Sequence, residues 1–194
     1  MNKLKKTLLC LLIIFCPVAI IGIWFLVHSL RTSATYTITP EKSQIENAIL
    51  ERINRPTIET KSIDIIQELN LDNKKYVIIT FDKNEGYAEF TKGRNNKYKI
   101  GEVRYGDSVF SSEIKETNKG KYIFIICKNQ NHQALFAKVQ LDNKEYEIDI
   151  SQEKYGIAYC KVPNSTNVRF INIENIKFYD NNNIDITADV LLYE

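Results

Sequence analysis

A long apolar run at the N-terminus constrains this chain more than any other feature of its sequence. No charged residue lies between Leu8 and Val27, and Lys3, Lys5 and Lys6 precede the run. Because an α-helix rises about 1.5 Å per residue, about 20 residues cover about 30 Å, the thickness of the hydrocarbon core of a bilayer. The sequence therefore predicts a membrane-spanning helix in front of a polar body.

A cleaved signal peptide is the alternative interpretation of this run. Signal peptides have a shorter apolar core of about 7–15 residues and a cleavage site flanked by small residues. Here bulky Trp24 and Phe25 lie near the end of the run, and Arg31 precedes the best candidate cleavage position, near Ala34. We therefore expect an uncleaved anchor.

The charges on either side of the run predict its direction. Three lysines precede the run, whereas only Arg31 follows it closely, and positive residues favour the cytoplasmic side of a membrane. Trp24 fits the outer interface, where indole rings gather. We expect a single-pass protein of the plasma membrane, with a cytoplasmic N-terminus and with residues 32–194 extracytoplasmic.

The body that follows the anchor is nearly neutral. Four of the 26 Lys and Arg residues lie in residues 1–31, whereas all 24 Asp and Glu residues come later, which leaves 22 basic and 24 acidic side chains and a net charge of −2. Nucleic-acid-binding domains are usually strongly basic. The charge balance therefore argues against a nucleic-acid partner.

A short amphipathic helix is predicted soon after the anchor. Ile45, Ile49 and Ile53 recur at helical spacing and form one apolar face. Thr39 and Pro40 resemble a helix start, with Thr39 as N-cap and Pro40 at the first helical position. We expect the three isoleucines to pack on a sheet, which is the commoner use of such a face.

Strand patterns follow this helix. Apolar segments at residues 76–81, 87–90 and 97–103 are separated by turn sequences, a pattern typical of hairpins in an antiparallel sheet. We expect residues 36–118 to form a small α+β unit in which the helix covers one face of the sheet.

A second unit is predicted beyond a polar stretch at residues 113–120. Strand-like segments then recur about every 8–12 residues, the last two at 168–179 and 184–192, and predict a β-sandwich over residues 119–194. Residues 1–35 would hold the cytoplasmic tip, the anchor and a juxtamembrane segment. The expected fold class is mainly β (α+β), with a transmembrane helix, a helix-backed antiparallel sheet and a sandwich.

Only two cysteines lie outside the anchor, and both fall in predicted strands. An extracytoplasmic location would permit a disulfide between Cys127 and Cys160. Two separate buried thiols are the alternative. We expect the two residues to lie close enough to bond.

Candidate catalytic residues are scarce. The body has one histidine, His132, which cannot supply a zinc site made of several histidines. A Cys160 thiolate with His132 as base and Arg169 nearby has the residue types of a sortase-like enzyme, but the flanking sequence and the spacing do not match. We expect His132 to be exposed and far from Cys160.

One acidic turn superficially resembles a calcium loop. The EF-hand pattern needs Gly at its sixth position and Glu at its twelfth, and a loop beginning at Asp180 has Asp185 and Leu191 there. A tight turn is the better interpretation. We therefore assign no catalytic, cofactor-binding or metal-binding residues.

The predicted hairpin near residue 95 is basic. Five cations there accompany a single acid, Glu102. These candidate contacts for an anionic surface are Lys92, Arg94, Lys97, Lys99 and Arg104. They could meet anionic wall polymer or lipid headgroups. A solvated hairpin that turns alternate charges outward is the alternative.

Two stretches resemble a known group of proteins. The segment Gly86-Tyr87-Ala88-Glu89-Phe90-Thr91-Lys92-Gly93, continued by KYKIGEVRYG, is similar to the middle of uncharacterised single-pass membrane-anchored extracytoplasmic proteins of low-G+C Gram-positive bacteria. Lys177-Phe178-Tyr179-Asp180, followed by Asp185-Ile186-Thr187, is similar to their C-terminal end. The resemblance implies a location and an architecture, and it implies no activity.

Three functional hypotheses follow. The first is a non-catalytic, membrane-tethered extracytoplasmic binding or sensing module of the cell envelope. The second is a Cys-dependent envelope enzyme, and the third is a structural or accessory subunit of a membrane complex. Besides the membrane itself, a protein or an anionic wall polymer is the expected partner, and no cofactor is expected.

Overall fold

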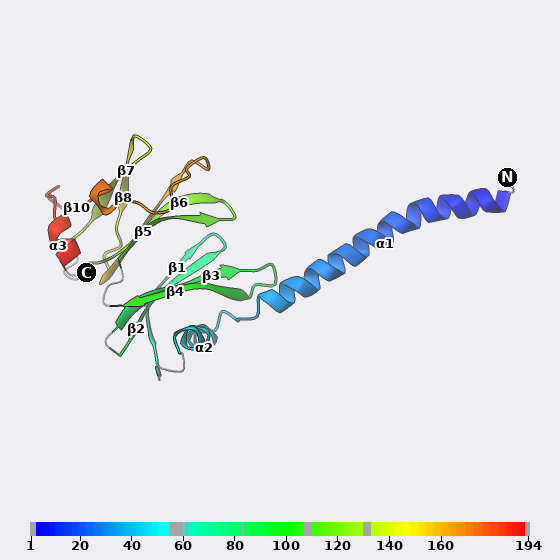
Figure 1. Ribbon diagram of the computed structural model, residues 1–194, viewed down its shortest axis with the longest axis horizontal. Coiled ribbons are helices and arrows are strands. Elements are labelled where there is room, and N and C mark those ends of the chain that lie inside the picture. The colour runs from blue at the N-terminus through cyan, green and yellow to red at the C-terminus, as the bar shows by residue number, and fades with distance from the viewer. Residues whose placement is uncertain are drawn as a thin grey trace.

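A computed structural model shows one long helix that projects from a layered β-rich body (Figure 1). The structure describes residues 3–54, 60, 62–82, 84–106, 110–129 and 133–192. The mainly β fold with antiparallel sheets confirms the predicted fold class.

Helix α1 (Lys3–Thr35) contains the whole apolar run. Its described apolar side chains, from Val18 to Leu30, are exposed rather than packed on the body. None of the residues from Val18 to Thr35 is buried by the rest of the protein. So many apolar side chains on one free helix would be unfavourable in water. This helix is long and apolar enough to cross a membrane.

Helix α2 (Lys42–Ile53) buries its predicted isoleucine face. Ile45, Ile49 and Ile53 are fully buried against the first sheet, which confirms the packing prediction. The predicted start at Pro40 is wrong, because the helix begins at Lys42 with Glu41 as N-cap. The preceding segment is held extended, since Ile38 exchanges two backbone hydrogen bonds with a residue of the first sheet.

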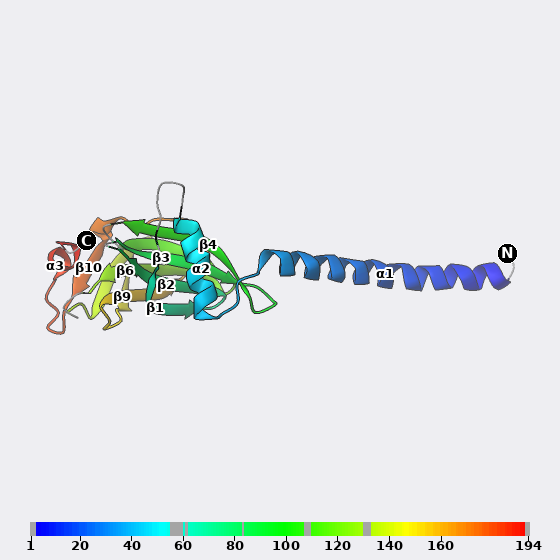
Figure 2. The ribbon, with the colours of Figure 1, turned by 90° about the horizontal axis from the view of Figure 1, so that it is seen from below.

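The first sheet contains four antiparallel strands in sequence order. They are β1 (Asp64–Leu71), β2 (Lys74–Phe81), β3 (Asn84–Lys92) and β4 (Tyr98–Gly106). Figure 2 shows α2 lying across these strands. Alternate residues of β2 are buried on opposite faces, because Val77 and Ile79 face α2 whereas Tyr76 and Ile78 face away from it.

The second sheet corrects the predicted boundary between the two units. Its strands are β5 (Ser111–Thr117), β6 (Gly120–Lys128) and β9 (Tyr155–Val162), in the order β5-β6-β9. The polar stretch at residues 113–120 is therefore not a separator but most of β5 and its turn. A boundary at residue 118 would divide the β5–β6 hairpin. The sequence did not predict β5 because the strand contains several charged residues. Their side chains face an ionic layer rather than an apolar core.

The third sheet is smaller and has the order β10-β7-β8. Its strands are β7 (Phe136–Leu141), β8 (Lys144–Asp149) and β10 (Ile176–Tyr179), and β10 follows a short 3-10 helix, η1 (Ile173–Asn175). The strand predicted over residues 168–179 is thus only four residues long.

The predicted last strand, at residues 184–192, is wrong. Helix α3 (Thr187–Leu192) occupies most of it. Ile186 and Val190 lie four residues apart, and both pack on the core around the third sheet. The Asp185 carboxylate accepts hydrogen bonds from the backbone N–H and the hydroxyl of Thr187, which favours helix initiation.

The layers stack in the order α2, first sheet, second sheet, third sheet (Figure 1). The first and second sheets share an apolar core in which the ring of Tyr76 lies 4.1 Å from that of Phe124. The opposite face of β6 packs on the third sheet through Ile123 and Ile125. The two predicted units therefore form one continuous body, with the second sheet buried between its neighbours.

Candidate functional site

Three hairpin turns gather at the end of the body from which α1 projects (Figure 1). We call them the basal platform: Asp72-Asn73 between β1 and β2, residues 93–97 between β3 and β4, and Asn118-Lys119 between β5 and β6. Asp72 and Asn96 have positive φ angles, 55° and 60°. Asp and Asn tolerate this left-handed conformation better than most residues, which explains the tight turns.

Hydrogen bonds lock the three turns together. The Thr117 hydroxyl donates to the Asp72 carboxylate at 2.6 Å, and this bond holds the pKa of Asp72 below its ordinary value. The Asn118 N–H donates to the Asn73 side chain at 2.9 Å, and the Lys92 N–H donates to the Asn73 carbonyl at 2.7 Å. Each turn thus positions another, and the platform is preorganised.

The end of α1 is fixed to this platform. Ile38 pairs with Tyr98 through backbone hydrogen bonds of 3.0 and 2.7 Å, and the Asn95 side chain donates to the Tyr36 carbonyl at 2.9 Å. A Cβ added to Gly93 would lie 2.5 Å from the Tyr36 ring, so the turn requires glycine there. The helix and the body are joined by specific contacts rather than by a free linker.

A cleft of about 670 Å³ lies between α1 and the platform. Its lining residues include His28 and Thr32 of α1, Tyr36 just beyond the helix, Asp72 and Asn73, Lys92, Arg94 and Asn96, and Asn118 and Lys119. His28 and Thr32 are four residues apart and therefore share one face of the helix, and the Tyr36 N–H, just beyond the helix end, donates to the Thr32 carbonyl at 2.9 Å. Cations and amides dominate the walls, and the single carboxylate, Asp72, is engaged with Thr117 and Lys119.

Four of the five predicted anion-contact residues are exposed, and three of these lie at or beside the platform. Lys92, Arg94 and Lys97 are exposed around the β3–β4 turn, and within the described residues no ion pair engages them. Lys99 is exposed farther along β4. The prediction for Arg104 is wrong, because its guanidinium pairs with Glu102 at 2.6 Å and Glu113 at 3.3 Å.

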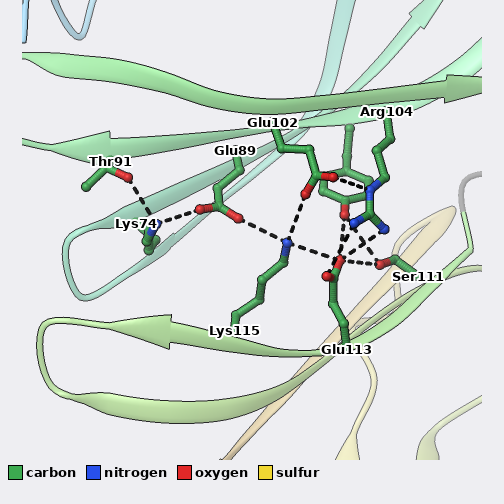
Figure 3. A network of polar contacts seen from close by, with 9 residues as sticks. Lys74, Glu89, Thr91, Glu102, Arg104, Ser111, Glu113 and Lys115 are labelled. Carbon is green, nitrogen blue, oxygen red and sulfur yellow. Dashed lines mark hydrogen bonds and ion pairs between the residues drawn. The ribbon is translucent and has the colours of Figure 1, made fainter. Parts of the chain in front are cut away.

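Arg104 belongs to an ionic layer between the first and second sheets (Figure 3). Lys115 lies at its centre, with its Nζ 3.0 Å from Glu89, 3.0 Å from Glu113 and 3.5 Å from Glu102. Lys74 completes the layer by pairing with Glu89 at 2.6 Å. Three cations thus balance three carboxylates.

The layer holds its central groups in their charged forms. Burial raises the pKa of Glu113, but the Tyr87 hydroxyl, which donates at 2.7 Å, and the Lys115 charge outweigh it, so the pKa lies below its ordinary value. Burial also opposes the charge of Lys115, yet the neighbouring acidic groups Tyr87, Glu89 and Glu113 raise its pKa to about 12. A general acid or base works best with a pKa near ambient pH. These shifts therefore suit a structural ionic layer.

The expected disulfide is wrong for this structure, because Cys127 and Cys160 are free. In the β6–β9 ladder, Cys127 faces Gly156 while Cys160 faces Ile123. The two cysteines are therefore four residues apart along the strands, about 13 Å at about 3.3 Å per residue. A disulfide needs Cα atoms within about 7 Å.

The Cys160 thiol lacks the features of an activated nucleophile. It is half-buried, and burial raises its pKa, whereas reactive cysteines have a lowered one. His132, the base of the alternative Cys-dependent enzyme, lies outside the described residues. The separation of His132 from Cys160 therefore stays a prediction.

The carboxylates of the acidic turn at residues 180–185 accept hydrogen bonds from nearby residues of the chain. The Asp180 carboxylate accepts hydrogen bonds from the N–H groups of Asn182 and Ile184, both at 2.8 Å, and the Asp185 carboxylate accepts from the N–H and the hydroxyl of Thr187. Within the described ranges, no group of three or more His, Cys, Asp or Glu side chains could hold a metal ion.

Comparisons with protein-family models, curated proteins and solved structures found no match. The resemblance of residues 86–106 to single-pass envelope proteins therefore stays a prediction. Two parts of the site were missed from the sequence: the turns at Asp72-Asn73 and Asn118-Lys119, and the carboxylates that surround Lys115. The sequence at these two turns did indicate them, since Asp and Asn are among the residues that favour tight turns.

Proposed function

We propose that this protein is a non-catalytic binding module of the cell envelope, tethered by α1 to the plasma membrane with its body outside the cell. The junction between α1 and the platform carries this proposal. Ile38 and Asn95 fix the helix end to the β3–β4 hairpin, so a membrane that α1 enters would lie on the side of the basal platform. A flexible tether would allow any face of the body to approach the membrane.

The chemistry of the described residues supports binding rather than catalysis. The ionic layer is charge-balanced, its central groups Lys115 and Glu113 are buried, and the Cys160 thiol is half-buried. The platform, by contrast, presents exposed cations without ion-pair partners among the described residues, which suits recognition of an anionic surface. The double substitution Cys160→Ser with His132→Ala should complement a deletion strain as well as the parent chain does.

Topology and contact can be tested in intact cells. Mass measurement should find an uncleaved chain, and external protease should digest the body while sparing the N-terminal tip. A mature chain beginning near residue 35 would contradict the proposal that α1 tethers the body to the membrane.

Site-specific photocrosslinking then tests binding at the platform. A photoreactive phenylalanine analogue replaces Lys97 in one variant and Lys144, the first residue of β8, in a matched control. Adducts with an envelope component from position 97 alone are expected. Equal adducts from both positions would contradict binding at the platform, and a single dominant protein adduct would favour the accessory-subunit hypothesis.

A further inference from the structure

The length of α1 and the position of its apolar run give the depth of the cleft relative to the membrane. If the hydrocarbon core is centred on residues 8–27, it ends near Val27. The headgroup regions bring a bilayer to about 40–45 Å, so each adds about 5–8 Å beyond the core. At about 1.5 Å per residue, this headgroup layer covers about residues 28–32 of α1. His28 and Thr32, which line the cleft, therefore lie at the level of the lipid phosphates.

Aromatic contacts support this depth. The Trp24 and His28 rings are stacked, with centroids 5.4 Å apart and planes 1° apart. Trp side chains prefer the membrane–water interface, and Trp24 lies one helical turn closer to the bilayer centre than His28. The cleft thus opens beside the interfacial turn of the anchor.

The charge of the cleft complements a phosphate group. Lys92 and Arg94 are exposed, and Arg94 also lines a second, smaller cavity with Phe25 and Ser29 of α1, which places Arg94 beside the helix. Asn96 and Asn118 add amide groups that can donate hydrogen bonds. Guanidinium and ammonium groups with several donors are the usual ligands of phosphate oxygens.

We propose that the cleft between α1 and the basal platform binds the phosphate of anionic lipid headgroups in the outer leaflet of the membrane that α1 spans. This inference rests on the proposed function, since it needs α1 to cross the bilayer with the body outside. Lipid is favoured over a soluble anion because one wall of the cleft is the anchor itself, which places the site within the headgroup layer. The locked turns keep the cations in place before a lipid arrives, which lowers the entropic cost of binding.

Lipid-selective quenching of fluorescence provides the test, because Trp24 is the only tryptophan of the chain. The full-length protein is placed in nanodiscs containing phosphatidylcholine and phosphatidylglycerol at equal mole fractions. In one preparation the phosphatidylglycerol is brominated in its acyl chains, and in the other the phosphatidylcholine is. We expect about twofold stronger quenching by the anionic lipid, because cations at an anionic surface enrich such lipids locally.

A charge-matched pair of variants isolates the cleft. The double substitution Lys92→Gln with Arg94→Gln should bring the quenching ratio close to one. The control, Lys144→Gln with Lys154→Gln, removes the same charge from the start of β8 and from the loop before β9, and it should keep the preference. Tyr155, next to Lys154, pairs with the end of β6 farthest from the platform. Circular dichroism verifies that both variants fold.

The outcomes separate this inference from the proposed function. Equal quenching by the two lipids in the parent protein, or a preference that persists in the Lys92→Gln with Arg94→Gln variant, would overturn the lipid site. Loss of the preference on adding soluble poly(glycerol phosphate) at matched ionic strength would assign the cleft to a polymer and also overturn it. Quenching by neither lipid would show that α1 does not enter the bilayer, which contradicts the proposed function itself.

Discussion

Removing the charge of Lys115 should destabilise the body strongly. The Lys115 side chain is 8% exposed and pairs with Glu89, Glu102 and Glu113, and the Glu113 side chain is only 4% exposed. Lys115→Met leaves three carboxylates facing two cations between the sheets. Breaking a buried ion pair from one side costs about 3–5 kcal/mol, because the remaining charge is desolvated and unpaired. For a protein of this size that corresponds to a loss of about 6–20 °C in Tm.

Thermal unfolding of the full-length protein in detergent micelles, followed by circular dichroism in the β-sheet band, measures this loss. Lys144→Met is the matched control, since Lys144 is exposed at the start of β8, and it should change the unfolding free energy by less than about 0.5 kcal/mol. Adding Glu113→Gln to Lys115→Met restores charge balance, so the double variant should lose less stability than the sum of the two single variants.

The pH dependence of stability gives an independent readout of the same layer. The pKa of Glu113 is lowered in the folded protein, so its contribution is present above the unfolded value of 4.5 and is lost as the pH falls through the folded pKa. The pKa of Lys115 is raised to about 12, so its contribution is complete below 10.5 and is lost as the pH rises through about 12. Glu113→Gln should therefore flatten the acid limb. A Lys115→Met variant that melts like the parent would refute this reasoning.

Three further predictions concern other parts of the molecule. Ile49→Asp places a charge in the fully buried face of α2 and should unfold the body or lower its stability by more than about 3 kcal/mol in urea titration, whereas parent-like unfolding would contradict the packing. Gly93→Ala forces a Cβ against the Tyr36 ring and should lower Tm, and adding Tyr36→Ala should recover much of the loss; a lack of recovery would argue against this contact. In the native protein, thiol labelling should reach Cys160 slowly and Cys127 only after unfolding, and detection of a disulfide between them would contradict the β6–β9 register.

Local patterns were sufficient to predict several elements. The uncharged run up to Val27 predicted α1, because length and hydropathy alone decide whether a helix can span a bilayer. The helical spacing of Ile45, Ile49 and Ile53 predicted the buried face of α2, since periodicity needs no knowledge of the partner. The turn sequence at residues 93–96 predicted the β3–β4 hairpin, because a turn between two strand-like segments is also a local pattern.

Tertiary structure alone decided the ionic layer and the cleft. Glu113 and Lys115 alternate with less polar residues in β5, a pattern that normally indicates a solvated face, and only the stacking of β5 on β3 and β4 buries them together. Arg104 shares a charge pattern with Lys92, yet it lies in this layer instead of on the platform. Likewise, α3 replaces a predicted strand because Ile186 and Val190 fit the core at helical spacing. The sequence by itself determined the anchor helix, the buried face of α2 and the hairpins of the first sheet, while the neighbour of each charged side chain was set by contacts between segments far apart in the chain, which no local pattern encodes.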